Sequence, residues 1–364
     1  MKLAVISLGG KTSLEIIEKA KGLFDAVDNL DLKRIEIKSN SKEQMVCYNG
    51  EALKKYDCIC IRGSFRYSML QSAISEIMKG KCYMPLSPEA FSICHNKFSS
   101  ILVLQKAGVP IPETYYAPSI GIAKKVLEKV QFPIIIKIPH GTQGKGVMFA
   151  DSLPSAKSVI DALEAFEQPY IIQEYIETGA TDIRAIVVGD KVVAAMRRKG
   201  SPQEIRANIH MGGVGAPYEL DPDTEAMAVK AAEAVGAGIC GVDILEGMSG
   251  KKNVVLELNA SPGLGGITAA TKKDIAGDIV RFLYAKSKSF TSDRSDDDYN
   301  SILESISPEK VPNGKIITNL NVKLGMIKLP PVVTKLSAFK AGDEVMVEAR
   351  KGLIEVKKHN TKYV

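Results

Sequence analysis

Residues 137–147 read KIPHGTQGKGV, a glycine-rich stretch that lies between two apolar segments, 132–138 (FPIIIKI) and 147–150 (VMFA). Its glycines follow the order G-x-x-G-x-G, the reverse of the dinucleotide-binding order, and neither Ser nor Thr follows the Gly-Lys pair as in a P-loop. Because both neighbours are strand-like, no helix N-terminus is available for a phosphate. The stretch is therefore predicted to be a movable turn whose backbone N–H groups close over phosphates, with Lys137 held on the first strand. A flexible hairpin without a ligand is the alternative.

A second strand pair is expected at 241–245 (GVDIL) and 253–259 (NVVLELN). A tight turn midway between the two strands places Asp243 opposite Glu257. Glu257 and Asn259 are two residues apart, so their side chains project from the same face of the strand. Carboxylate and amide oxygens without histidine or cysteine are ligands suited to Mg²⁺, and acidic groups inside apolar strands are costly unless they are paired or bind metal. An ion pair with a nearby lysine is the alternative.

A hairpin is predicted over 181–198, where TDIRAIVV and KVVAAMRR flank the Gly-Asp pair at 189–190. A two-residue turn makes Asp182 face Arg197, with Arg184 beside them on the same face. Clustered arginines on a rigid hairpin are suited to bidentate recognition of a carboxylate or a phosphate. Solvated surface charge is the alternative. The further polar side chains that follow in the segment EIRANIHMGGVG are Arg206 and Asn208.

The composition limits the class of protein. At 364 residues, with 45% hydrophobic and 25% charged residues, the chain resembles a globular protein of two or three domains. No apolar run approaches the about 20 residues needed to cross a membrane, and the first residues, MKLAVISLGG, resemble a buried strand more than a secretion signal. Six scattered cysteines without a CxxC pair, and only four histidines, argue against zinc and for reduced core thiols in a cytoplasmic protein.

The order of the elements predicts the domains. Residues 1–95 alternate strands and helices, which favours βαβ units on a parallel sheet. Residues 288–310 are polar and acidic and indicate a linker. Residues 311–364 are strand-rich and carry ten basic against four acidic side chains, which accounts for the whole net charge of +6. Strands are expected at 2–8, 33–39, 56–63 and 169–176, and helices at 12–24, 68–80, 97–108, 154–167 and 222–236.

Taken together, seven motifs resemble the ATP-grasp superfamily, and within it the RimK-like branch of ATP-dependent carboxylate–amine ligases. They occur in the family order over about residues 1–285, and they are Asn96-Lys97, IIIKIPHGTQGKGV at 134–147, QEYI at 173–176, DIRAIVVGDKVVAAMRR at 182–198, IRANIHMGG at 205–213, GVDIL at 241–245 and ELNASPGLGG at 257–266. The resemblance implies an α/β pre-ATP-grasp domain (1–95) and an α+β ATP-grasp domain (96–287) whose two lobes hold ATP between antiparallel sheets, with residues 139–147 as the lid.

The resemblance also implies roles for individual residues. The nucleotide-binding set is Lys97 and Lys137 for the phosphates, the main chain around Gln173, Glu174 and Ile176 for the adenine, and the lid glycines Gly141, Gly144 and Gly146. Asp182 either belongs to this set or only orients Arg197. Asp243, Glu257 and Asn259 hold two Mg²⁺ ions, with Mn²⁺ as a possible replacement. The catalytic set, which steadies the transferred phosphoryl group and the substrate carboxylate, is Arg184, Arg197, Arg206 and Asn208.

The implied reaction has two steps: a carboxylate is phosphorylated by ATP, and an amine then attacks the acyl phosphate. Relatives in this branch commonly add glutamate to a coenzyme, a peptide or a protein C-terminus, and they are frequently homo-oligomers, so glutamate is the favoured amine. A dipeptide- or glutathione-type ligase stays open, as does a nucleotide-regulated protein with a nucleic-acid-binding tail. Residues 311–364 are weakly similar to an AbrB-like swapped-hairpin module, which implies dimerisation or nucleic-acid contact; a small β cap is the alternative.

Overall fold

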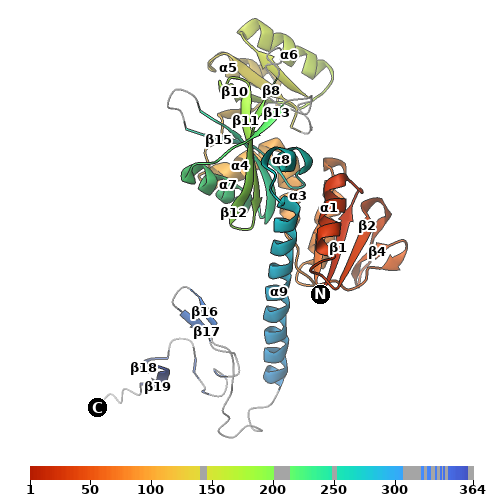
Figure 1. Cartoon of the computed structure of the whole chain (residues 1–364). Coiled ribbons are helices and arrows are strands. Elements are labelled where there is room, and N and C mark those ends of the chain that lie inside the picture. Colours follow the sequence, from red (N-terminus) through yellow and green to blue (C-terminus); the bar gives the residue numbers. More distant parts are fainter. Residues whose placement is uncertain are drawn as a thin grey trace. The chain divides into compact units, whose positions relative to one another are not determined.

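The structure is a computed structural model that describes residues 1–139, 146–200, 214–247 and 252–305. In the C-terminal part it describes 321–323, 326–328, 333, 337, 339–340 and 343–359. The chain divides into two units, Met1–Lys288 and Ser289–Val364. The candidate site lies in the first unit, which is described first (Figure 1).

The N-terminal region contains a parallel sheet in the order β2-β1-β6. Its strands are β1 (Lys2–Ser7), β2 (Ala26–Asp31) and β6 (Cys58–Ile61), and α1 (Lys11–Ala20) connects the first two. The predicted strand at 33–39 does not belong to this sheet: β3 (Ile35–Ser39) pairs in an antiparallel sheet with β4 (Gln44–Tyr48) and β5 (Glu51–Ala52). The predicted strand is therefore present but in another sheet, and its place beside β1 is taken by β2, AVDNLD, which was not predicted because it is rich in Asp and Asn, residue types that are rare in strands.

Three helices lead from this region into the rest of the unit: α2 (Ser68–Met78), α3 (Pro88–His95) and α4 (Lys97–Lys106). The helix predicted at 97–108 is thus present. Asn96 caps it, since its Oδ1 accepts hydrogen bonds from the Phe98 and Ser99 backbone N–H groups, both at 3.1 Å. The cap fixes Lys97 at the first turn of α4, and the Lys97 backbone N–H donates to the Pro139 carbonyl at 3.2 Å.

A four-stranded antiparallel sheet in the order β7-β10-β8-β9 forms the next layer. Its strands are β7 (Thr114–Tyr116), β8 (Ile134–Lys137), β9 (Val147–Ala150) and β10 (Ile171–Glu174), and the helices α5 (Ile120–Leu127) and α6 (Leu153–Ala165) cover one face of it (Figure 1). The glycine-rich stretch joins β8 to β9, which pair antiparallel as predicted. The Ile138 N–H donates to the Gly146 carbonyl at 2.9 Å and closes the base of this connection.

A five-stranded antiparallel sheet, β13-β12-β11-β14-β15, carries most of the candidate residues. The strands are β11 (Thr181–Val188), β12 (Lys191–Lys199), β13 (Val214–Pro217), β14 (Ile239–Leu245) and β15 (Val254–Asn259). The helix α7 (Pro222–Ala234) packs small alanines against one face, and α8 (Gly265–Thr271) and α9 (Ile275–Ser305) lie on the other. Together, the parallel N-terminal sheet and the antiparallel sheets confirm the predicted mixed α/β and α+β fold class.

The register of the β11–β12 hairpin differs from the prediction. Val188 pairs with Lys191 as expected, but a bulge beyond Val187 shifts the pairing by one residue, so Asp182 faces Arg198 and not Arg197. One extra residue in a strand reverses the faces of all residues beyond it. Arg198 therefore shares a face with Asp182 and Arg184, and Arg197 lies on the face that α7 covers.

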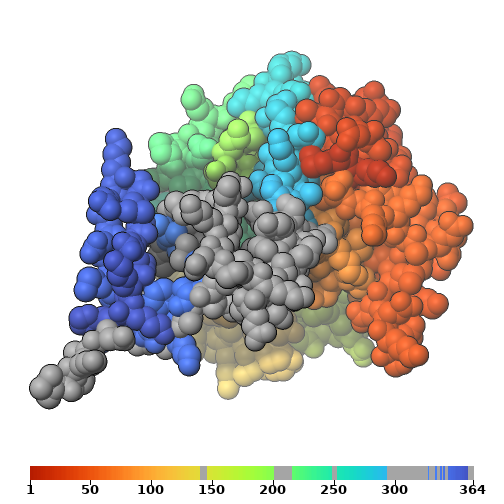
Figure 2. All heavy atoms as spheres, turned by 90° about the horizontal axis from the view of Figure 1, so that it is seen from below, coloured from red at the N-terminus to blue at the C-terminus, as the bar shows by residue number. Residues whose placement is uncertain are grey.

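The helix α9 runs through the first part of the predicted linker. It continues to Ser305, so residues 288–305 of the predicted linker are helical. No Gly or Pro occurs between residues 278 and 307, so nothing in the sequence interrupts the helical hydrogen-bond ladder there. The first turns of α9 lie against the N-terminal region (Figure 2), where the Phe24 and Tyr284 rings meet edge to face at 5.3 Å.

In the second unit, two short strand pairs are described. They are β16 (Asn321–Lys323) with β17 (Met326–Lys328), and β18 (Val345–Arg350) with β19 (Leu353–Lys358). The latter turns at Lys351 and Gly352, and Gly352 has a φ of 80°. Likeness to a swapped-hairpin module and a nucleic-acid role for this unit stay predictions. None of the described helices is long and apolar enough to span a bilayer.

Candidate functional site

A cavity of about 510 Å³ opens on the α8 side of the five-stranded sheet. Its wall is formed by the start of α4, by β11 and β12, by the end of β15 and the following residues 260–267, and by residues 63–65 of the N-terminal region. Four of the predicted site residues line it: Lys97, Arg184, Glu257 and Asn259. Arg198, which sequence reasoning missed, also lines it.

A smaller cavity of about 90 Å³ lies between the four-stranded and five-stranded sheets. Its wall is largely apolar, with Ile135, Val147, Phe149, Leu245 and Leu256 among its residues. The predicted nucleotide-binding residues that line it are Lys137, Gln173, Glu174, Ile176 and Asp182. Since Asp182 and Arg184 are two residues apart on one face of β11, the two cavities adjoin along this strand.

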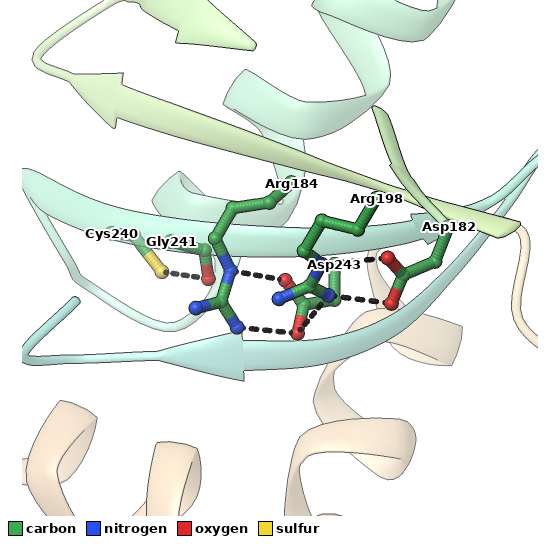
Figure 3. A network of polar contacts seen from close by, with 6 residues as sticks. All are labelled: Asp182, Arg184, Arg198, Cys240, Gly241 and Asp243. Carbon is green, nitrogen blue, oxygen red and sulfur yellow. Dashed lines mark hydrogen bonds and ion pairs between the residues drawn. The ribbon is translucent and has the colours of Figure 1, made fainter. Parts of the chain in front are cut away.

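Two arginines and two aspartates form a buried network at this junction (Figure 3). Arg184 binds Asp243 through two hydrogen bonds, from Nε to Oδ1 at 2.8 Å and from Nη2 to Oδ2 at 2.7 Å. Arg198 binds Asp182 in the same way, at 2.6 and 2.5 Å. The Arg198 Nη2 atom also lies 3.1 Å from Asp243 Oδ2. Asp243 thus lies between two guanidinium groups, which fixes both arginines at the edge of the cavity.

The two aspartates of the network have opposite pKa shifts. Burial raises the pKa of Asp243, but the charges of Arg184 and Arg198 outweigh it and lower the pKa to about 2. For Asp182, burial outweighs the hydrogen bonds and charge of Arg198, and the pKa rises to about 6. Asp243 is therefore firmly ionised at neutral pH, whereas Asp182 holds its charge less strongly.

Lys137 is buried at the end of β8. Its Nζ donates to Gln173 Oε1 at 2.6 Å, and Gln173 Nε2 donates in turn to Thr114 Oγ1 at 2.8 Å. Burial lowers the pKa of Lys137 to about 8; the nearby Glu257 opposes this shift, and Lys97 adds to it. The ammonium group is held in place by a neutral amide and has no bonded carboxylate, so it can take an anion as a further partner.

The three candidate metal ligands lie together. Asp243 on β14 pairs with Glu257 on β15, as predicted, and Asn259 pairs with Gly241. The candidate set therefore has two carboxylates and one amide. No group of three His, Cys, Asp or Glu side chains that could hold a metal ion occurs in the described part of the chain. Burial raises the pKa of Glu257, although Lys97 opposes it, and the Asn259 Nδ2 atom is buried without an acceptor.

These residues fit a divalent cation. A carboxylate has about four lone-pair positions, and the hydrogen bonds and ion pair from Arg184 and Arg198 use three of those on Asp243. One position stays available, and none of the described residues donates a hydrogen bond to Glu257 that would compete. A cation next to Glu257 would offset the cost of burying its charge. The oxygen-only set is typical of Mg²⁺.

Arg197 does not lie in either cavity. Its Nη2 binds both Glu246 oxygens, at 2.9 and 2.7 Å, and its guanidinium lies 4.3 Å from the centre of the Tyr218 ring. The prediction that Arg197 faces Asp182 was wrong, because β12 contains a bulge that reverses the faces of the residues after it. The order of apolar and polar residues along β12 does not reveal this bulge. The predicted residues Gly141, Gly144, Arg206 and Asn208 lie outside the described residues. Gly146 is described and has a φ of 77°.

Residues 94–283 match the model of the RimK-like ATP-grasp domain. The chain belongs to the RimK-like ATP-grasp family. A probable alpha-L-glutamate ligase of Thioalkalivibrio sulfidiphilus is 36% identical over 288 residues, which make up 78% of this chain and 95% of the relative. Probable alpha-L-glutamate ligase 1 of Pseudoalteromonas atlantica is 37% identical over 291 residues, 79% of this chain and 96% of the relative. The RimK-like chain is therefore an ATP-dependent ligase, and the predicted family is confirmed.

Solved structures of similar fold agree with this assignment. The ATP-grasp ligase PsnB, complexed with a minimal precursor, has a TM-score of 0.62 at 21% identity and covers 78% of this chain and 98% of its own. The RimK domain protein of Sphaerobacter thermophilus has a TM-score of 0.61 at 15% identity and covers 78% of this chain and 99% of its own. At these identities the likeness shows the fold. PsnB has also been solved with Mg and ADP bound.

Proposed function

We propose that this RimK-like ligase joins the amino group of glutamate to a carboxylate through an acyl phosphate, releasing ADP and phosphate. The proposal rests on one observation: cationic side chains and side chains suited to binding a metal ion line the same cavity. Lys97, Arg184 and Arg198 line the same wall as Glu257 and Asn259, and an apolar pocket beside Lys137 adjoins it. This arrangement suits a nucleotide whose base is buried and whose phosphates extend toward the arginines.

The small cavity supports the base of ATP. Its apolar residues cover the faces of a purine, and the main chain around Gln173, Glu174 and Ile176 offers hydrogen-bonding groups for its edge. Lys137, held by Gln173 at the end of β8, then binds the phosphates as they pass into the large cavity, where Lys97 continues the line of cations. Asp182 acts by accepting two hydrogen bonds from Arg198, which hold that guanidinium in place. Arg198 therefore takes the role predicted for Arg197 from the sequence.

Asp243, Glu257 and Asn259 would hold Mg²⁺, whose charge neutralises the phosphate oxygens when it is bound. Arg184 and Arg198 donate hydrogen bonds to the transferred phosphoryl group and to the substrate carboxylate. Because Asp243 and Asp182 fix both guanidinium groups before the substrates bind, little reorganisation is needed when charge develops. Arg206 and Asn208 belong to the same proposed set.

The reaction needs no nucleophile from the protein. A carboxylate oxygen of the acceptor attacks the γ-phosphorus, and the bond from that phosphorus to ADP breaks. The amine nitrogen of glutamate then attacks the acyl carbon, the C–N bond forms, the amine loses a proton, and inorganic phosphate leaves. Because water would hydrolyse the acyl phosphate, the connection 139–147 is proposed to act as a lid over it. The Ile138–Gly146 hydrogen bond holds the two ends of this connection together.

Glutamate is proposed as the amine because the relatives that share over a third of their residues with this chain are named probable alpha-L-glutamate ligases. The acceptor is proposed to be a coenzyme, a peptide or a protein C-terminus. A dipeptide- or glutathione-type reaction is the alternative. The location in the cytoplasm, the assembly into homo-oligomers and the use of two metal ions are proposed with it.

A substrate screen tests the proposal. The purified chain is incubated with ATP, Mg²⁺ and pairs of candidate acceptors and amino acids, and products are read by mass spectrometry together with ADP and phosphate release. The expected result is a product heavier by one or more glutamyl residues, with phosphate release that requires both the carboxylate and the amine. Phosphate release that no amine or carboxylate affects, or turnover untouched in Glu257→Ala, would contradict the proposal.

A further inference from the structure

One buried arginine has no carboxylate partner among the described residues. Arg62 follows β6, where its backbone N–H still donates to the Ile6 carbonyl at 2.8 Å, and the residue is only 7% exposed. Its Nη2 donates to the Pro262 carbonyl at 2.7 Å, whereas its Nε is buried without an acceptor. Burial lowers the pKa of Arg62, and only the Cys60 thiol acts in the opposite direction. The guanidinium charge is therefore left uncompensated.

The other buried arginines among the described residues of the unit have carboxylate partners. Arg184 and Arg198 each bind an aspartate through two hydrogen bonds. Removing a charge from water costs several kcal/mol unless an opposite charge or a full set of hydrogen bonds offsets it. A neutral carbonyl offsets only a part of this cost for Arg62. A buried cation of this kind is stabilised when an anionic ligand binds beside it.

The large cavity lies next to Arg62. Gly63, Ser64 and Phe65, which directly follow Arg62, line it, and so does Pro262, whose carbonyl the guanidinium contacts. The residues from Ser261 to Ile267 that line this part of the wall carry no charge. The Arg62 guanidinium does not itself line the cavity but contacts this region of the wall from behind, through the Pro262 carbonyl, whereas the proposed phosphate-binding cations come from β8, β11, β12 and the start of α4.

A second polar group accompanies Arg62. Gln71 on α2 is fully buried, and both atoms of its side-chain amide are without a hydrogen-bond partner. It packs beneath residue 63, because a Cβ built on Gly63 would lie 2.5 Å from the Gln71 Nε2 atom. Two independent side chains therefore leave donors unused behind the same short segment of the cavity wall.

We infer that Arg62 binds a carboxylate of a substrate at the N-terminal-region side of the large cavity, with Gln71 as an additional donor. The inference rests on the proposed ligase function, since it names a group of that substrate which does not react. Arg184 and Arg198 serve the transferred phosphoryl group and the reacting carboxylate. The carboxylate at Arg62 comes either from glutamate, which keeps both carboxylates free when it reacts through its amine, or from a second carboxylate of the acceptor.

Isothermal titration of the full-length chain loaded with ADP and Mg²⁺ tests the inference. The probes are L-glutamate, which represents the amine substrate, and N-acetyl-L-glutamate, which has no free amine and represents an acceptor end. L-glutamine and the α-amide of glutamate identify which carboxylate faces Arg62. The variants are Arg62→Gln and Arg62→Lys, and the matched control is Arg66→Gln, which removes the same charge from an exposed position four residues later.

The expected result is that at least one carboxylate probe binds the unaltered protein, and that Arg62→Gln weakens this binding at least tenfold. A charge-assisted bidentate pair supports a loss of that size. Arg62→Lys should retain part of the affinity, Arg66→Gln all of it, and ADP binding should change less than twofold in all three. If Arg62→Gln fails to fold, Arg62→Lys against Arg66→Gln decides the same question.

Two results would overturn the inference: equal affinity of Arg62→Gln and the unaltered protein for every probe, or binding of ADP but of no carboxylate probe. In the first case Arg62 serves only to hold residues 261–262 against the N-terminal region. Failure of the unaltered protein to bind ADP would instead refute the proposed function, so the two failures are distinguished in one experiment.

Discussion

The pKa of Lys137, lowered by burial from 10.5 to about 8, is expected to make nucleotide binding depend on pH. At about 1.4 kcal/mol for each pKa unit, this fall amounts to a penalty of about 3 kcal/mol on the charged form of the side chain. Among the described residues, the Lys137 Nζ atom has only the Gln173 amide oxygen as a hydrogen-bond partner. A nucleotide phosphate beside Nζ would restore the charged form, so binding above pH 8 must be accompanied by the uptake of a proton.

The expected magnitude follows from this linkage. Between about pH 8 and the higher pKa of the nucleotide-bound protein, the affinity for ADP in Mg²⁺ should fall up to tenfold per pH unit. The terminal phosphate of ADP has a pKa of about 6, so its own titration contributes little to the pH dependence of binding above pH 8. Isothermal titration from pH 7 to 9.5, repeated in buffers of different ionisation enthalpy, should show an uptake that approaches one proton at pH 9.

The stability of the nucleotide-free protein should respond to pH in the opposite direction. The folded-state pKa of Lys137 is depressed, so above pH 8 the unfolded chain binds more protons than the folded chain, and the free energy of unfolding rises with pH. This contribution is fully present above the unfolded pKa of 10.5 and is lost as the pH falls through about 8. Urea unfolding of the unaltered chain and of Lys137→Gln at each pH isolates the contribution of this side chain.

Lys137→Gln should bind ADP more weakly at pH 7 and should lose the dependence on pH. The matched control is Lys125→Gln, which changes an exposed lysine on α5 and should leave both quantities unaltered. The reasoning would be refuted by an affinity that is constant from pH 7 to 9.5 in the unaltered chain, or by an equal slope in Lys137→Gln.

Three further predictions test the register, the metal ligands and the packing of the five-stranded sheet. In steady-state assays, Arg198→Met should lower kcat at least a hundredfold. Arg197→Met should change kcat by less than about fivefold, because Arg197 lies on the other face of β12. A larger loss of kcat in Arg197→Met than in Arg198→Met would contradict the bulge. Glu257→Gln should weaken the Mg²⁺-dependent part of ADP binding at least tenfold without lowering the thermal midpoint, because a neutral group is easier to bury there; a lower midpoint in calorimetry would count against this account. Gly189→Ala should lower the free energy of unfolding, measured with urea, by about 1–3 kcal/mol. Residue 189 has a φ of 66°, and an added Cβ would lie 2.9 Å from the Phe282 ring. An unchanged unfolding midpoint would contradict this prediction, because it would show that the turn adjusts without cost.

The sequence predicted correctly where local patterns decide the structure. Apolar strands on both sides of the glycine-rich stretch indicated its strand-to-strand setting, which the pairing of β8 with β9 confirms. The pairing of Asp243 with Glu257 followed from a turn placed midway between the two strands, and the helix expected from residue 97 does begin there as α4, where Asn96 caps it. These features depend on strand period, turn length and capping, which are properties of short segments.

Other predictions failed because a local pattern did not carry the information. The bulge in β12 changes no residue type, yet it exchanges Arg197 for Arg198 on the face of the cavity. The strand β2 was missed because Asp and Asn are poor strand formers, and it is stabilised by pairing with β1. The helical state of residues 288–305 was not predicted because polar composition was given more weight than the absence of Gly and Pro.

The sequence by itself therefore determined the family, the strand-to-strand setting of the glycine-rich stretch and the pairing of Asp243 with Glu257, because strand alternation, glycine order and paired polar residues are local signals. Only the tertiary structure decided which arginines share a cavity and which of them lack an anion. Arg198 is fixed there by Asp182 on a neighbouring strand, and Arg62 is buried against Pro262, two hundred residues later in the chain. Burial and the balance of charge depend on contacts between distant segments, and no pattern within a short segment records them.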